Sequence, residues 1–258
     1  GAGAAAAWED AGGITFKEGG TNFSNSLLVG TSTTGTLNAA ENNVGMGNAT
    51  LQLITEGDNN TALGRASMAS LTTSDSNTGV GNGAGRYITT GNGNNTNIGV
   101  NSGYYNATGT YNTGVGSSSL MGASGQNNSY NAALGYSALG AVTTGNYNTA
   151  LGHTAGGNIT SGSGNIIIGD VNAAAADSAR TLKITSYDGS TTTNHIISDG
   201  SGNMTLAADL TIGDDLLLDS DSCVLKFGDD QDVTLTHTDG TGLTLNSTSK
   251  LCFQDTGT

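Results

Sequence analysis

The chain has 258 residues, with 42 glycines, no proline, 5% aromatic residues and 11% charged residues, which is unlike an ordinary globular domain. Its formal net charge is −14, with 3 basic and 7 acidic groups in residues 1–169 and 4 basic and 14 acidic groups in residues 170–258. This balance argues against nucleic acid and anionic membrane as partners, because both require patches of Lys and Arg. No run of 18 apolar residues is present, so we expect no membrane insertion.

Residues 1–29 are predicted to form a lead-in segment. The segment opens with small residues, and Ile14-Thr15-Phe16 then alternates in the manner of a strand. We therefore expect a short strand ahead of the repetitive part of the chain.

Residues 30–169 carry a repeated phrase: Asn, one to three small or polar residues, an aliphatic residue, then Gly. The closing glycines are Gly30, Gly45, Gly64, Gly81, Gly99, Gly116, Gly135, Gly152 and Gly169. From the second phrase on, the aliphatic residues before them are Val44, Leu63, Val80, Ile98, Val115, Leu134, Leu151 and Ile168. The differences between successive glycine numbers are 15, 19, 17, 18, 17, 19, 17 and 17. A period near 17 is too short for a helix pair or a propeller blade and predicts one coil of a β-solenoid.

One aliphatic residue per coil buries too little apolar surface to offset the entropy of ordering the coil. We therefore expect these residues also to pack against other copies of the chain, with the adjacent glycines allowing close approach of backbones. The Asn that opens each phrase is expected in a turn, where it tolerates positive φ. Disorder is the alternative for this composition, but a solvated coil has no need of a regular aliphatic repeat.

The pattern changes after Gly169. Residues 170–180 are predicted to form a connector, and residues 181–258 a second all-β repetitive fibre module that continues beyond 258. Its first strands are expected at 181–185, 195–198 and 204–206, with Asp-Gly turns at Asp188 and Asp199.

The phrases Asn112-Thr113-Gly114-Val115-Gly116 and Asn148-Thr149-Ala150-Leu151-Gly152 resemble the β-roll heads of trimeric autotransporter adhesins, the YadA-like heads. They are more similar still to tail fibres and other virion structural proteins of bacteriophages. The resemblance covers roughly residues 42–258. It implies a parallel homotrimer in which each chain is a left-handed β-roll followed by fibrous segments. The coils of this chain are longer than those of such heads, which leaves loop extensions and register open.

Six tyrosines cluster in the second half of the repeats. They are Tyr104, Tyr105, Tyr111, Tyr130, Tyr136 and Tyr147. Two interpretations are open: an exposed sugar-binding face, and packing across a seam between subunits. Packing across a seam is the more common use of tyrosine at such positions, and we favour it.

No constellation of catalytic or metal-ligating residues is recognisable. The three histidines are far apart in the sequence, and the two cysteines have neither metal-ligand spacing nor the number needed for a disulfide framework. These residues are His153, His195, His237, Cys223 and Cys252. The acidic clusters between 214 and 232 are interpreted as solvated turn carboxylates, with cation binding on a trimer axis as the alternative. We expect no catalytic residue, no cofactor and no metal ligand.

These observations predict a non-enzymatic, homotrimeric phage tail fibre or similar extracellular virion appendage that spaces and presents surfaces for a host-cell glycan or protein. One alternative is a trimeric autotransporter adhesin head on a bacterial surface. Another is a β-solenoid that binds ice or calcium, although ice binding requires Thr-x-Thr in register on every coil and the Thr pairs of this sequence skip coils. The enzymatic alternative, a polysaccharide depolymerase, needs paired carboxylates in a groove. Residues 30–169 contain only four carboxylates, Glu41, Glu56, Asp58 and Asp75.

Overall fold

The computed structural model describes residues 7–11, 14–31, 33–91 and 93–206. All of them belong to one compact unit, Gly1–Leu210, of the two into which the chain divides. Most of the predicted second module, including Cys223, Cys252, His237 and the acidic clusters, lies outside the described residues. Within them the chain forms strands and turns and no helix, which confirms the predicted all-β class.

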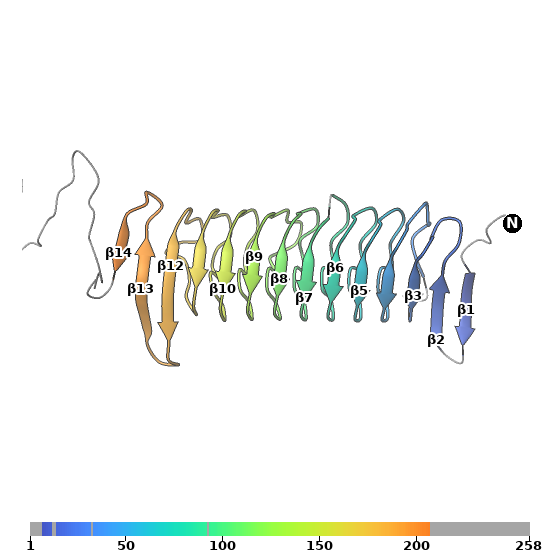
Figure 1. The fold of residues 1–258 in the computed structure, drawn as a ribbon, viewed down its shortest axis with the longest axis horizontal. Coiled ribbons are helices and arrows are strands. Elements are labelled where there is room, and N and C mark those ends of the chain that lie inside the picture. Colours follow the sequence, from blue (N-terminus) through green and yellow to red (C-terminus); the bar gives the residue numbers. More distant parts are fainter. Residues whose placement is uncertain (1–6, 12–13, 32, 92, 207–258) are drawn as a thin grey trace, which may run out of the picture. The chain divides into compact units, whose positions relative to one another are not determined.

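Fourteen strands of the described residues form one sheet in which the order in space follows the order in the chain (Figure 1). They are β1 (Ala7–Ala11), β2 (Ile14–Glu18), β3 (Leu27–Val29), β4 (Val44–Met46), β5 (Thr61–Leu63), β6 (Thr78–Val80), β7 (Thr96–Ile98), β8 (Thr113–Val115), β9 (Ala132–Leu134), β10 (Thr149–Leu151), β11 (Ile166–Ile168), β12 (Leu182–Tyr187), β13 (Thr192–Ser198) and β14 (Met204–Leu206).

Strands β3 to β11 are the rungs of a parallel β-solenoid of about nine turns, and equivalent positions on successive turns are mostly 17 apart in the sequence. Each rung is short and pairs in parallel with the next, as Thr61 with Thr78 and Leu63 with Val80. The connecting segments return on the other side of the stack (Figure 1). At about 4.8 Å per rung, the eight intervals span roughly 40 Å. The predicted solenoid and its period are confirmed.

One phrase of the predicted repeat is displaced by two residues. Strand β4 pairs Met46, not Val44, with Leu63, so Gly47 is the glycine that follows the rung. Val44 pairs with Thr61, and Gly45 occupies the middle of the strand opposite Ala62. With Gly47 in place of Gly45, the first two spacings both become 17, so the coil length is more uniform than the sequence pattern indicated.

The interior is filled from two sources. The middle residue of each rung is buried and the residues on either side of it face outward. The return segments supply most of the larger apolar side chains. The buried apolar residues include Leu28, Leu51, Ile54, Met68, Leu71, Ile88, Leu120, Leu139, Val142, Ile159 and Ile167. The interior therefore does not depend on the aliphatic residue of each phrase, and the expectation that these residues form part of each coil's core is wrong.

The glycines that follow the rungs stack in a column of their own. A Cβ atom placed on Gly135 would lie 2.1 Å from the carbonyl oxygen of Gly152, and one on Gly116 would lie 2.3 Å from that of Gly135. The φ angle of Gly135 is +138°, which L side chains rarely adopt. These glycines bring the backbones of successive coils of one chain close together, and the close approach expected between copies of the chain stays a prediction.

The repeated asparagines form a buried ladder, contrary to the expectation that they sit in turns with positive φ. From Asn60 on, each side-chain amide donates to the Oδ1 atom of the asparagine one coil earlier, as Asn77 to Asn60 at 3.0 Å and Asn95 to Asn77 at 3.0 Å. We call this set the asparagine ladder: Asn43, Asn60, Asn77, Asn95, Asn112, Asn131, Asn148 and Asn165. The positive φ belongs to the residue before each one, for example Asn59 at +58°.

Residues 170–180, expected as a connector, continue the coil pattern. Ala173 is buried against the preceding coil, and β12 pairs in parallel with β11. Strands β12, β13 and β14 then form an antiparallel meander, with the predicted turns at Asp188 and Asp199. Backbone N–H groups of these turns bond the two carboxylates and lower their pKa values; for Asp199 the Asn203 side chain is the largest cause. Strands β1 and β2 cover the edge of β3 in the same antiparallel manner, so no rung presents an open edge.

Candidate functional site

The outer face of the nine rungs carries a continuous row of apolar side chains, one from the third residue of each strand. We call it the aliphatic column: Val29, Met46, Leu63, Val80, Ile98, Val115, Leu134, Leu151 and Ile168. The five most exposed members have 37–55% of their surface accessible. The predicted aliphatic positions therefore form one row, except for Val44, which lies on the same face at the first position of its rung. An exposed apolar row about 40 Å long is characteristic of an interaction surface.

A column of threonines lies beside the aliphatic column, on the first residue of the rungs. Thr61, Thr78, Thr96 and Thr113 are in register on four successive strands. Ala132 then interrupts the column before it resumes at Thr149. The sequence interpretation missed this column because it followed the Thr-Thr pairs of the return segments instead.

Three of the clustered tyrosines form a stack on one edge of the solenoid. The ring centroids of Tyr111 and Tyr130 are 5.1 Å apart, and those of Tyr130 and Tyr147 are 4.8 Å apart, with interplanar angles of 7° and 4°. We call these residues the tyrosine ladder. Each has 46–63% of its surface exposed. The ladder follows the stacking of the coils, since each tyrosine immediately precedes a member of the asparagine ladder.

The tyrosine ladder occupies backbone positions that suit other residues better. Its φ angles are +58°, +60° and +58°, in the left-handed region that costs a bulky L residue roughly 1–2 kcal/mol. Equivalent positions on other coils carry Asn42, Asn59, Ser76, Asn94 and Gly164. Two stacked ring pairs return about 0.5–1.5 kcal/mol each, which does not exceed three such penalties. Ring stacking alone therefore does not account for tyrosine at these three positions.

The residue that precedes each tyrosine of the ladder, or its equivalent on the other coils, changes from acidic to neutral along the solenoid. On the early coils it is Glu41, Asp58 or Asp75, and the Asp58 and Asp75 carboxylates accept bonds from backbone N–H groups one coil earlier. Beside the tyrosine ladder these acidic residues are replaced by neutral ones, Thr110, Ser129 and Asn146. Residues 87–169 contain no Asp, Glu, Lys or Arg at all. The aromatic stretch of the edge is therefore also an uncharged stretch.

A second aromatic cluster lies on the return segments of two coils. The rings of Tyr87 and Tyr105 are stacked at 5.5 Å, and Tyr104 meets both edge-on at 5.2 and 4.6 Å. The Arg86 guanidinium lies 5.6 Å from the Tyr87 ring centroid and 5.8 Å from that of Tyr104. Because the three rings pack on one another and the guanidinium makes cation–π contacts with two of them, the cluster stabilises these coils locally.

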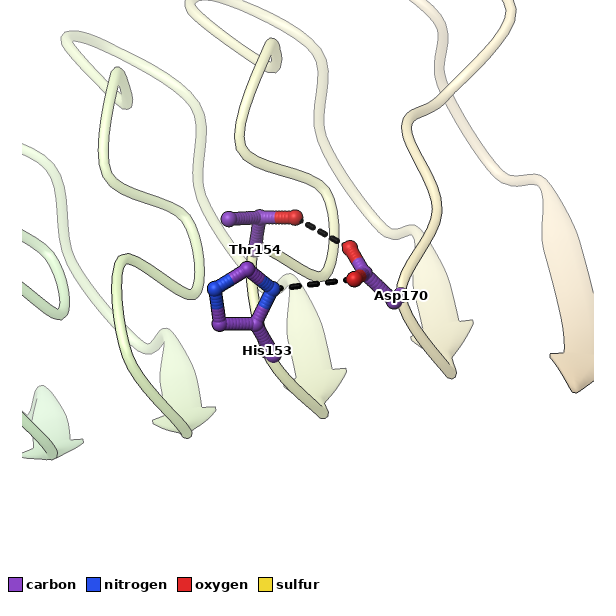
Figure 2. A network of polar contacts seen from close by, with 3 residues as sticks. All are labelled: His153, Thr154 and Asp170. Atoms are coloured by element: carbon purple, nitrogen blue, oxygen red, sulfur yellow. Dashed lines mark hydrogen bonds and ion pairs between the residues drawn. The ribbon is translucent and has the colours of Figure 1, made fainter. Parts of the chain in front are cut away.

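A small network of polar contacts joins His153 and Thr154 to Asp170 at the last predicted coil (Figure 2). His153 Nδ1 lies 2.9 Å from Asp170 Oδ2, and the Thr154 hydroxyl donates to Asp170 Oδ1. The Thr154 bond is the largest cause lowering the pKa of Asp170; desolvation opposes it, and the hydrogen bond and charge of His153 add to it. The His153 ring also stacks on Tyr136 at 5.3 Å. Thr154 lines a shallow hollow of about 400 Å³ with small and amide side chains around it.

None of these groupings has the form of a catalytic or metal site. Within the part of the chain that the structure describes, no cluster of three or more His, Cys, Asp or Glu residues is placed to hold a metal ion. His153 and His195 lie on different elements and pair with Asp170 and Ser186 respectively. In those same residues no helix has the length and apolar character needed to cross a membrane.

Comparisons with known proteins add no relatives. No family model matches the sequence, and neither a curated protein nor a solved structure matches it.

Proposed function

We propose that the chain is a structural segment of a homotrimeric fibre, a phage tail fibre or similar virion appendage, that spaces and presents surfaces for host attachment. The observation that carries this proposal is the aliphatic column. In a single chain five of its nine members are exposed, between Met46 and Leu151, and the other four are partly buried. Three copies arranged in parallel would bury their aliphatic columns together, with each rung meeting the equivalent rungs of its neighbours.

The fold supports a mechanical role. The rungs are joined by backbone pairing, by the asparagine ladder and by the glycine column, all of which repeat along the axis. Such an assembly holds whatever lies at its ends at a fixed separation. A trimeric adhesin head on a bacterial surface would use the same architecture; secretion and anchoring segments encoded in the same gene would distinguish it from a virion fibre.

The test replaces two members of the aliphatic column by aspartate, Leu134→Asp and Leu151→Asp, in the full chain. Both side chains are about half exposed in one chain, so its fold tolerates the charges. In a trimer the charges would be buried without partners, at a cost of several kcal/mol. The doubly substituted protein should therefore sediment as single chains while keeping its circular dichroism spectrum.

The matched control is Leu53→Asp, the same chemical change at an exposed leucine of a return segment. This variant should keep the mass of the unmodified protein. An unchanged mass for the Leu134→Asp, Leu151→Asp protein would contradict burial of the column between copies.

The threonine column favours ice binding as a second candidate function. Threonine hydroxyl groups repeat on this face at about 4.8 Å between rungs, and the aliphatic side chain of each rung lies roughly 6.6 Å along the strand from its threonine. This candidate requires the face to be open, whereas the fibre requires it to be covered. Thermal hysteresis of the freezing point that disappears in a Thr96→Lys variant would favour ice binding; a solution without hysteresis would exclude it.

A further inference from the structure

We propose that the tyrosine ladder and the neutral residues beside it form a binding edge for an uncharged saccharide chain. The inference rests on the proposed role of the chain in presenting attachment surfaces, and it names both the site and the chemistry of the ligand. Three observations carry it: the stacked, exposed rings, the unfavourable backbone positions they occupy, and the loss of charge at the same coils.

The geometry of the stack defines what a ligand meets. Tyr130 lies between two parallel rings, so its faces are covered and its edge remains accessible. Tyr147 ends the ladder: the next coil places Gly164 at the equivalent position, and glycine has no side chain to cover the ring. Tyr147 is also the most exposed of the three, at 63%. We place one sugar ring on this open face and the adjoining sugars along the tyrosine edges.

The chemistry of the edge selects a neutral, hydroxyl-rich partner. Aromatic rings pack against the C–H faces of sugars, and phenol hydroxyl groups donate to and accept from sugar hydroxyls. Thr110, Ser129 and Asn146 line the edge with further uncharged polar groups. The chain as a whole carries a net charge of −14, which repels acidic polysaccharides, and residues 87–169 contain no Lys or Arg to attract them. The next cation along this edge is Arg180, one coil beyond Gly164, and its Nε atom donates to the Gly200 carbonyl.

Protein packing on the same rings is the competing explanation. Rings buried at a seam between copies would contribute to assembly, so their replacement would change the oligomeric mass. Rings that bind a saccharide would leave the mass unchanged. The two explanations are therefore separated by measuring mass and binding on the same samples.

The experiment applies the full chain to a printed array of neutral oligosaccharides built from glucose, mannose, galactose or N-acetylglucosamine, with sialylated and sulfated oligosaccharides alongside. The test variant is Tyr111→Asn, Tyr130→Asn, Tyr147→Asn, which introduces the residue that other coils already use at this position. The control is Tyr187→Asn, an exposed tyrosine of β12 outside the ladder. The mass of each protein is measured by light scattering.

The unmodified chain and the Tyr187→Asn control should bind one or more neutral oligosaccharides. The triple variant should bind them about tenfold more weakly or worse, as expected for the loss of several aromatic contacts, with no change in mass. Binding to no neutral oligosaccharide, preference for the acidic ones, undiminished binding by the triple variant, or a change in its mass would each overturn the proposal. If the chain is a trimer but binds no saccharide, the saccharide site is refuted and the proposed fibre is not. If the chain is monomeric but binds saccharide through the tyrosines, the trimer is refuted and the saccharide site is not.

Discussion

Asn131 bonds to Asn112, one coil earlier, through both its backbone and its side chain: the backbone N–H and the side-chain amide both donate to Asn112 Oδ1, at 3.0 and 3.2 Å. The same double contact recurs along the asparagine ladder. At one end the Thr181 hydroxyl donates to Asn165 Oδ1 at 2.7 Å, and at the other the Ser26 hydroxyl accepts from the backbone N–H of Asn43 at 2.8 Å. The ladder thus ends in hydroxyl groups that satisfy its terminal atoms.

Replacing a ladder member should therefore destabilise the coil stack. Asn112→Ala removes the acceptor of both Asn131 donors and the donor that bonds the Asn128 carbonyl. Because the groups left behind are buried, we expect a loss of about 2–4 kcal/mol in the free energy of unfolding. Urea denaturation followed by circular dichroism measures it. The exposed Asn127→Ala change should alter the free energy by less than about 0.5 kcal/mol, and equal effects at the two sites would refute the ladder's contribution.

The glycine column should be intolerant of any side chain. Gly135→Ala places a methyl group against the Gly152 carbonyl and forces alanine into a positive φ. Strain and overpacking together should cost about 2–5 kcal/mol. Gly125→Ala isolates the backbone strain from the overpacking. Gly125 also has a positive φ, but nothing lies within 4 Å of the added carbon. Thermal melting should show a clearly larger loss at Gly135 than at Gly125.

The tyrosine ladder should contribute little to stability. Tyr130→Asn loses two stacked contacts and gains a residue that accepts φ near +60°. These effects oppose each other, so the free energy of unfolding should change by less than about 1 kcal/mol in either direction. Chemical denaturation provides the measurement. A loss of several kcal/mol would mean that the rings are present for the fold rather than for a ligand.

Asp170 should give the last coil a pH-dependent contribution. Its folded-state pKa is lowered, chiefly by the Thr154 hydroxyl, so the ionised form is favoured in the folded chain. The resulting stability is fully present above the unfolded-state pKa of about 3.9 and disappears as pH falls through the lower folded-state value.

The contribution is small because the contact lies at the surface, on the order of 0.2–1 kcal/mol. The difference in melting temperature between the unmodified chain and Asp170→Asn should be constant near neutral pH and should shrink under strongly acidic conditions. A difference that grows on acidification would contradict the assignment.

The sequence was sufficient to predict the solenoid because its determinants are local. A glycine with a positive φ follows nearly every rung, and its spacing gives the coil length directly. The error at Gly45 has a simple cause: both Val44-Gly45 and Met46-Gly47 match an aliphatic-glycine pair. The asparagine ladder resolves the choice, since Asn43 stands four residues before Gly47 just as Asn60 stands four before Gly64.

The orientation of the side chains was harder to predict. A three-residue rung has too few positions to show which residues face inward, so the sequence pattern predicts the aliphatic residues in the interior although the middle residues occupy it. Asparagine suits both turns and buried ladders, and only the stacking of coils distinguishes them. The tyrosine ladder was visible as a cluster, but its stacking and its positive φ depend on the equivalence of positions that are one full coil apart.

The mass of the unmodified chain in solution, measured by light scattering over a range of concentrations, shows whether other copies cover the aliphatic column. We predict an assembly of three times the 25.5 kDa of one chain, because the aliphatic column would be covered by its counterparts on two other copies. A stable mass of 25.5 kDa at every concentration would show that the column remains open and would contradict the fibre.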